Sequence, residues 1–107
     1  MKKIKLLVII VERSIVDKIN DTISKMGVEF SHICYGIGTA KNDILNLLGI
    51  GETEKGLIFA SIDENKISLL YNKLNKTFGF DKPGSGIAFT IPITSVGGPA
   101  SLKILEG

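Results

Sequence analysis

Two residues capable of metal binding or nucleophilic chemistry lie close together in the sequence. His32 and Cys34 are separated by one residue, so on a β-strand their side chains project from the same face. With a third ligand such a pair can bind a metal ion. The chain has one His and one Cys, so a carboxylate would have to complete the site. We favour the alternative that both are core or interface residues, and a nucleophilic pair would lack a third group to orient the His.

Acidic pairs offer no better catalytic site. Glu52 and Glu54 lie in a glycine-bounded segment, and paired carboxylates act in acid–base catalysis only when held rigidly away from water. Asp63 and Glu64 are expected to begin a helix. We therefore expect no catalytic residue, no bound metal and no enzymatic activity.

Glycines form the strongest candidate for a ligand site. Three Gly-x-Gly pairs occur, at Gly36/Gly38, Gly49/Gly51 and Gly84/Gly86. None extends to a dinucleotide-binding Gly-x-Gly-x-x-Gly motif, and a tight turn can explain each pair. The last pair, with Ser85 between its glycines, leads directly into an apolar strand. Closely spaced glycines let backbone N–H groups approach an anion without interference from Cβ atoms.

The elements that must position these residues follow from hydrophobic periodicity and turn signals. We expect strands at 4–11, 28–37, 57–62 and 87–93, long helices at 14–26 and 63–78, and a short helix at 39–48. This order predicts the α+β, ferredoxin-like βαββαβ sandwich, in which two helices cover one face of a four-stranded antiparallel sheet. The first and third strands are expected at the centre. Pro92 favours an edge position for the fourth strand.

Helix boundaries have their own signals. Ser14 is a candidate cap for the first long helix, and Gly27 a candidate stop. Asp63 is expected to cap the second long helix, and residues 49–56 to form a mobile turn. The apolar faces of the two helices are predicted at Ile15, Ile19 and Ile23, and at Ile67, Leu70, Tyr71, Leu74 and Phe78.

The first strand is apolar on both faces, although two helices can cover only one face of the sheet. Its two sets of alternating residues are Leu6, Val8 and Ile10, and Leu7, Ile9 and Val11. A strand apolar on both faces is typically buried on both. We therefore expect a second copy of the chain to cover the other face, as part of a homo-oligomer.

Composition bounds the remaining possibilities. A length of 107 residues predicts one domain, 1–107, and a net charge of +2 is too small to indicate nucleic-acid binding. One cysteine excludes an internal disulfide and favours the cytoplasm, and no segment has the ~20 apolar residues of a membrane-spanning helix.

The segment 39–56 has two interpretations. Its apolar residues Ile44, Leu47 and Leu48 fall on one side of the predicted short helix. They can pack on their own subunit, or they can dock into a groove on a partner protein.

The sequence resembles the PII-like (nitrogen regulatory protein P-II) superfamily, as a divergent member. The resemblance covers nearly the whole chain and rests on the opening Met-Lys-Lys-Ile, Gly36-Ile37-Gly38, Gly84-Ser85-Gly86 and Ile91-Pro92-Ile93. It implies a cytoplasmic homotrimer whose sheets face inward. It also implies an adenine-nucleotide effector bound between subunits, and a transporter or enzyme target engaged by the segment between the second and third strands.

The resemblance implies a ligand site formed by Gly36, Gly38, Thr39, Gly84, Ser85 and Gly86, and a partner-binding surface at Ile44, Leu47 and Leu48. Ile87 stands where the family has a phosphate-binding Lys, residues 94–98 lack the family's two Arg, and Ala40 replaces a Gln. These differences favour a sensor with a changed or lost ligand, for which Lys41 and Lys82 are candidate replacement charges. The alternatives are a metal-binding trimer that resembles the CutA copper-tolerance proteins and uses His32 and Cys34, and a small enzyme on a ferredoxin-like scaffold.

Overall fold

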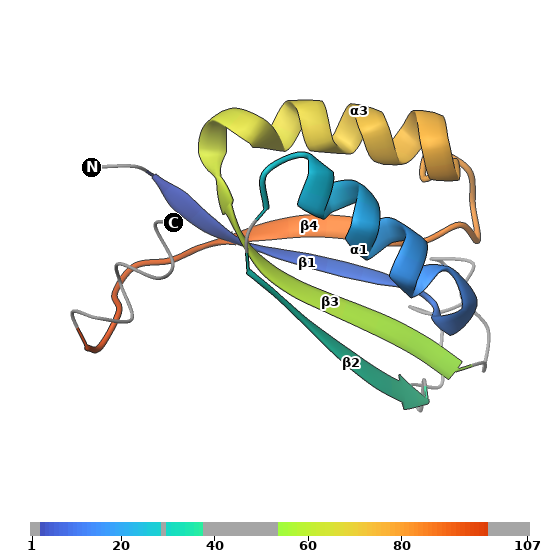
Figure 1. Cartoon of the computed structure of the whole chain (residues 1–107), viewed down its shortest axis with the longest axis horizontal. Helices are drawn as coiled ribbons and strands as arrows, with labels where there is room; N and C mark the ends of the chain where they lie inside the picture. The colour runs from blue at the N-terminus through green and yellow to red at the C-terminus, as the bar shows by residue number, and fades with distance from the viewer. Residues whose placement is uncertain (1–2, 29, 38–53, 99–107) are drawn as a thin grey trace.

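The computed structural model describes residues 3–28, 30–37 and 54–98, and these form two layers (Figure 1). The strands are β1 (Ile4–Glu12), β2 (Ser31–Ile37), β3 (Glu54–Asp63) and β4 (Ile87–Pro92). The helices are α1 (Val16–Lys25) and α3 (Ile67–Phe78), preceded by the short 3-10 helices η1 (Arg13–Ile15) and η2 (Glu64–Lys66). Both α-helices lie on the same face of one sheet, which confirms the predicted ferredoxin-like sandwich.

The strand order is β2-β3-β1-β4, and every neighbouring pair is antiparallel. The first and third strands are therefore central, as predicted. Pro92 is the last residue of β4 and pairs with Lys5 of the neighbouring strand β1. Because proline donates no ladder hydrogen bond, its place at the end of an edge strand is the expected one.

The hydrophobic core lies between the sheet and the two helices. Ile19 and Ile23 of α1 are fully buried, as are Leu70 and, nearly so, Leu74 of α3. They pack against the strand residues Leu7, Ile9, Val11, Ile58, Ala60 and Ile62. The apolar stripes predicted for both helices are confirmed, and together they cover the full width of the central strands.

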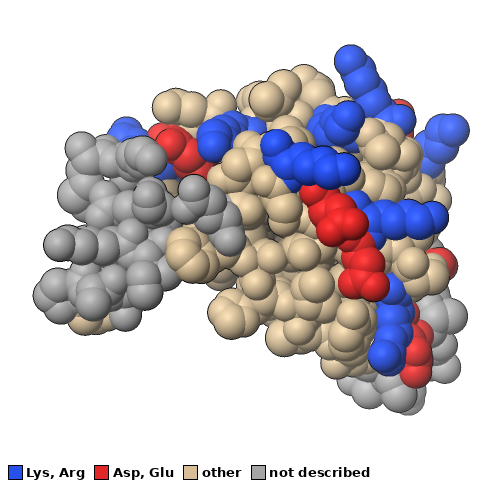
Figure 2. Space-filling view, viewed as in Figure 1, with Lys and Arg blue, Asp and Glu red and all other residues tan. Residues whose placement is uncertain are grey.

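The other face of the sheet is apolar, and neither helix covers it. The strand register places His32, Phe59, Val8 and Phe89 in one row across this face. Phe89 is 37% exposed and Ile91, on the same face of β4, is 45% exposed. The expectation that the first strand has a second apolar face is therefore confirmed. In Figure 2 the charged side chains gather over the helices and at one end of the sheet.

The signals for helix ends succeeded in two cases out of three. Gly27 has a φ of 92°. Its N–H bonds to the Ser24 carbonyl, and the Val28 N–H bonds to the Ile23 carbonyl. This pair of bonds is the Schellman motif that ends α1. The Asp63 carboxylate accepts a hydrogen bond from the Asn65 N–H at 3.3 Å and so caps η2, through which the chain enters α3.

The predicted Ser14 cap is wrong. Ser14 lies inside η1, α1 begins only at Val16, and neither Glu12 nor Ile15, which precede the two helical segments, makes a side-chain capping bond. The chain turns through the 3-10 helix before α1, because this turn brings Val16 down onto the sheet, where it is fully buried.

The starts of two strands differ from the prediction by three residues each. β2 begins at Ser31, and Val28, where the strand was expected to begin, packs in the core instead. β3 begins at Glu54, so Gly56 belongs to a strand and not to a mobile turn. Gly56 lies directly under Val16, and a Cβ atom at this position would clash with the Val16 side chain. The glycine is required by close packing of helix on strand.

Candidate functional site

The Gly84-Ser85-Gly86 turn connects α3 to β4 through a series of tight bends. Gly79 ends α3 with a φ of 68°, and Gly84 and Gly86 also have positive φ values, of 87° and 141°. The Lys82 N–H donates to the Gly79 carbonyl at 2.9 Å, and the Ser85 N–H to the Lys82 carbonyl at 3.4 Å. The conformation of the turn therefore depends on glycine, since other residues rarely adopt such φ values.

Gly86 is also fixed by its neighbours. A Cβ atom here would lie 2.7 Å from Val11 Cγ1, 3.0 Å from Phe80 Cζ and 3.1 Å from the Ile10 carbonyl oxygen. This close approach sets the start of β4, where Ile87 pairs with Ile10. Packing alone thus explains Gly86, and the turn presents its backbone at the β4 edge of the sheet.

Gly36 lies at the opposite edge and has a different environment. It pairs with Lys55 in the β2–β3 ladder, and a Cβ atom here would meet nothing within 4 Å. Packing against the described residues therefore does not require this glycine. The other two residues proposed for this half of the site, Gly38 and Thr39, lie outside the described residues, as do Lys41 and the partner-binding set Ile44, Leu47 and Leu48.

Gly36 and the Gly84-Ser85-Gly86 turn, the described parts of the predicted ligand site, lie at the same end of the sheet but on opposite edges. Two strands, β3 and β1, separate Gly36 from Gly86. Three inter-strand spacings of about 4.8 Å place them roughly 14 Å apart. One subunit does not bring these glycines together. In an assembly that sets the β2 edge of one copy beside the β4 edge of the next, the two halves could face a single cleft.

A charged and aromatic cluster, absent from the sequence predictions, occupies the β2 side of this end of the sheet. The Arg13 guanidinium lies over the Tyr35 ring, 4.2 Å from its centroid. Its Nη1 also donates to Glu54 Oε2 at 3.4 Å. Arg13 therefore contacts both Tyr35, near the end of β2, and Glu54, the first residue of β3. The pattern of strand pairing, which places Tyr35 opposite Gly56, was the signal needed to find this cluster.

His32 and Cys34 project from the uncovered face of β2, as their spacing predicts. Both are exposed, and their partners across β3 are the apolar residues Phe59 and Leu57. Over residues 3–28, 30–37 and 54–98, no group of three or more His, Cys, Asp or Glu side chains lies close enough to hold a metal ion. Among these residues the pair therefore has apolar neighbours across the ladder and no third ligand.

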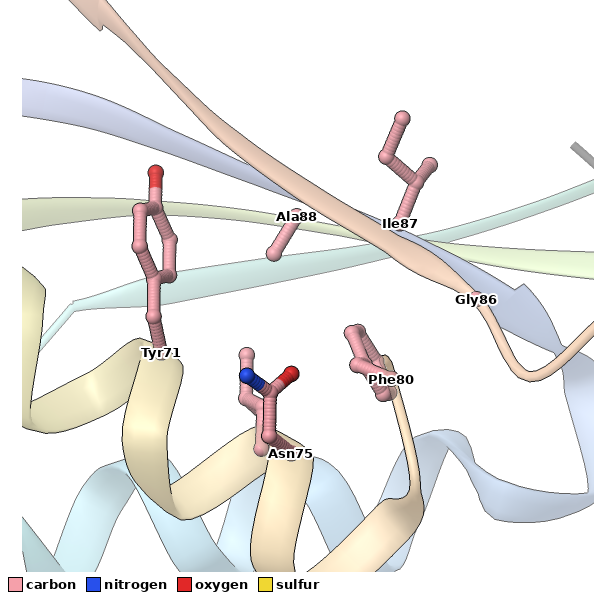
Figure 3. Close-up of a pocket in the computed structure, with 7 residues that line it drawn as sticks. Tyr71, Asn75, Phe80, Gly86, Ile87 and Ala88 are labelled. Atoms are coloured by element: carbon pink, nitrogen blue, oxygen red, sulfur yellow. The ribbon is translucent and has the colours of Figure 1, made fainter. Parts of the chain in front are cut away.

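A pocket of about 250 Å³ adjoins the glycine turn on the helical side of the sheet (Figure 3). Residues of α3 and β4 form its walls, and Gly86 and Phe80 close the end nearest the turn. The residues that line it are Tyr71, Leu74, Asn75, Phe80, Gly86, Ile87 and Ala88. Of these, only Gly86 belongs to the site predicted from the sequence.

Comparison with known proteins adds evidence from structure and none from sequence. No family model matches the chain, and no curated protein matches it significantly. Among solved structures, the model is similar to CPII, a nitrogen regulatory PII-like protein from Thiomonas intermedia K12 bound to ADP, AMP and bicarbonate. The TM-score is 0.67 at 23% identity, over 90% of this chain and 94% of CPII.

Two further structures agree with this likeness. CPII bound to ADP, AMP and acetate has a TM-score of 0.69 at 22% identity, over 92% of this chain and 93% of CPII. A DUF3240 family protein from Shewanella baltica OS155 has a TM-score of 0.65 at 19% identity, over 92% of this chain and 98% of that protein. At these identities the likeness is one of fold. The chain therefore has the fold of the PII-like proteins, as its resemblance in sequence predicts.

Proposed function

We propose that this chain is a PII-like regulatory protein that assembles as a homotrimer and binds an effector of adenine-nucleotide type between subunits. The observation that carries the proposal is the likeness to CPII, which extends over 90% of this chain and whose solved structure contains ADP and AMP. The proposed effector site combines Gly36, Gly38 and Thr39 of one subunit with the Gly84–Ser85–Gly86 turn of the next.

The environment of the glycines supports a site between subunits. Gly36 and the Gly84-Ser85-Gly86 turn lie on opposite edges at one end of the sheet, and an assembly that sets these edges side by side would bring them together. Gly36 has open space where its side chain would be, and this space is available to a ligand or a neighbouring chain. Exposed Lys82, in the loop before the turn, remains the candidate charge for an anionic effector.

The uncovered face of the sheet supports self-association. It carries apolar residues of β3, β1 and β4 side by side, including the exposed residues Phe89 and Ile91. Burial of such a surface stabilises an assembly by about 25 cal/mol per Å² of apolar area. Three inward-facing sheets would remove this surface from water and place His32 and Cys34 at the interface.

The proposed output is regulation of a partner protein through segment 39–56, with no catalytic step in this chain. Ile44, Leu47 and Leu48 are the residues we propose to contact a transporter or enzyme target. Neither of the two α-helices described in the structure is long and apolar enough to cross a membrane.

The first test measures the mass of the purified protein in solution and then its thermal unfolding with ATP, ADP, AMP, cyclic AMP, cyclic di-AMP, S-adenosylmethionine, 2-oxoglutarate and bicarbonate. At 100 times its dissociation constant a ligand stabilises the folded state by about 2.7 kcal/mol. We expect the mass of a trimer and a rise in Tm with an adenine compound. A monomeric mass contradicts the proposed assembly, and a trimer with no ligand response contradicts nucleotide sensing.

A matched pair of variants locates the effector. Gly36→Ala and Gly97→Ala each add one methyl group where nothing lies within 4 Å, so neither should disturb the fold. Gly36→Ala should weaken binding of the effector found in the screen, whereas Gly97→Ala, beyond the end of β4, should not. Equal affinities for both variants would remove Gly36 from the site.

A further inference from the structure

The pocket between α3 and β4 lies within one subunit, on the helical side of the sheet, and shares only Gly86 with the site proposed between subunits. Figure 3 shows Tyr71 and Asn75 projecting from α3 toward β4, and Ala88 pointing back from β4 toward the helix. Phe80, from the segment that follows α3, stands beside Gly86. The Ile87 side chain points to the opposite face of the strand, so this part of the wall is backbone.

The chemistry of the lining restricts the ligand. None of the lining residues is charged, so the walls provide no partner for a phosphate or carboxylate group. Two aromatic rings, those of Tyr71 and Phe80, stand on either side of the Asn75 carboxamide. Aromatic rings favour a planar apolar partner, and a carboxamide offers a donor and an acceptor side by side.

The size of the pocket restricts the ligand further. Its volume of about 250 Å³ lies below the ~300–1,000 Å³ range of sites for drug-sized ligands. Ala88 is the smallest side chain in the wall, and it faces Asn75 across the space between β4 and α3. The pocket is therefore of a size that suits one small ring system.

We propose that this pocket binds a small, neutral, planar heterocycle that carries a hydrogen-bond donor next to an acceptor, the chemistry of a free nucleobase. The ring lies between Tyr71 and Phe80, and its polar edge pairs with the Asn75 carboxamide. The site is complete in one subunit and does not depend on the proposed trimer or on a nucleotide effector.

The two tyrosines of the chain allow a direct test. The sequence has no tryptophan and two tyrosines, Tyr35 and Tyr71, so Tyr35→Phe leaves Tyr71 as the only fluorescent tyrosine. Adenine is the probe. Stacking beside Tyr71 should change its emission saturably, and absorption by the probe is corrected with free tyrosine at the same adenine concentrations. A linear response identical to that of free tyrosine overturns the proposal.

Two valine substitutions on one face of β4 provide the specificity control. In the Tyr35→Phe background, Ala88→Val narrows the pocket and should weaken adenine binding about tenfold or more. Thr90→Val, two residues along the strand, keeps the side-chain size and lies outside the pocket lining. It should leave binding unchanged. Equal affinity in the two variants overturns the proposal.

Asn75→Ala tests the polar edge. This variant should bind adenine about two- to tenfold more weakly, the net effect of one hydrogen bond. Benzimidazole, a fused ring without the exocyclic amino donor, should bind the variant and the parent protein almost equally. A parallel loss for both probes would show that Asn75 shapes the pocket without pairing with the ligand. All three measurements remain valid if the protein binds no nucleotide or is monomeric.

Discussion

Gly36 and Gly86 belong to the two halves of one predicted site, yet they differ in backbone conformation and in the atoms that surround them. Gly86 is surrounded by Val11, Phe80 and the Ile10 carbonyl, and its φ of 141° lies where other residues are strained. Gly36 has nothing within 4 Å of the position of a Cβ atom and lies in an ordinary strand. Contacts within the chain therefore explain Gly86, whereas no contact among the described residues explains Gly36.

The largest effect is expected at the packed glycine. Gly86→Ala combines strain at a positive φ with a clash against the Val11 side chain of β1, each of which typically costs about 1–3 kcal/mol. We expect the free energy of unfolding to fall by about 3 kcal/mol, measured by urea unfolding at fixed protein concentration. A loss below about 1 kcal/mol would mean that the turn can rearrange, and the contrast with Gly36 would disappear.

Gly56 extends the comparison to the helix–sheet contact. Gly56→Ala should lower the free energy of unfolding by about 2 kcal/mol, because the added methyl group meets the Val16 side chain. Val16→Ala creates space at the same point and costs stability by itself. The double variant should therefore be more stable than the sum of the two single losses predicts, and strict additivity would contradict the contact.

Arg13 provides an intermediate case at the β2 edge. Arg13→Ala removes the ring contact with Tyr35 and an ion pair to Glu54 whose side chains are 52% and 63% exposed. Such exposed interactions contribute about 1 kcal/mol in total. The loss should show in thermal unfolding at low salt and shrink at high salt if the ion pair dominates. A loss independent of salt would assign the effect to the ring contact.

The smallest effect on stability is expected at Gly36. Gly36→Ala should leave the free energy of unfolding unchanged or raise it by about 0.5 kcal/mol, since alanine restricts the unfolded chain and meets no obstacle in the strand. Urea unfolding checks this value. A clear destabilisation would show that an assembly already fills the space at Gly36, and the mass in solution would then distinguish a weakened trimer from an unfolded subunit.

The sequence was sufficient to predict the framework because the framework depends on local periodicity. The apolar residues on both faces of β1 predicted its central position, and Pro92 predicted that β4 is an edge strand. Isoleucines spaced four residues apart predicted the buried face of α1. Each of these features follows from residues that are close together in the sequence, whichever segment packs against them.

The errors and omissions depend on contacts between distant segments. Ser14 has the chemistry of a helix cap, but the need to bury Val16 places it in a 3-10 turn. Glycine is typical of loops, but Gly56 lies in strand β3, where it packs directly against Val16 of α1. The Arg13–Tyr35 contact and the pocket beside Asn75 arise only when the elements that carry these residues pack against one another. The ligand site predicted from the glycines remains a prediction, since one subunit does not bring Gly36 and Gly86 together.

The order of the strands also decides when this chain can fold. β1 is made first, but its partners are β3, whose Asp63 pairs with Ile4, and β4, whose Pro92 pairs with Lys5. During synthesis β1 must therefore wait until β3 and β4 have emerged before both of its partners are present. Folding dominated by such distant pairings is intrinsically slow and exposes aggregation-prone segments. The nascent chain should therefore depend on chaperones until β4 is complete.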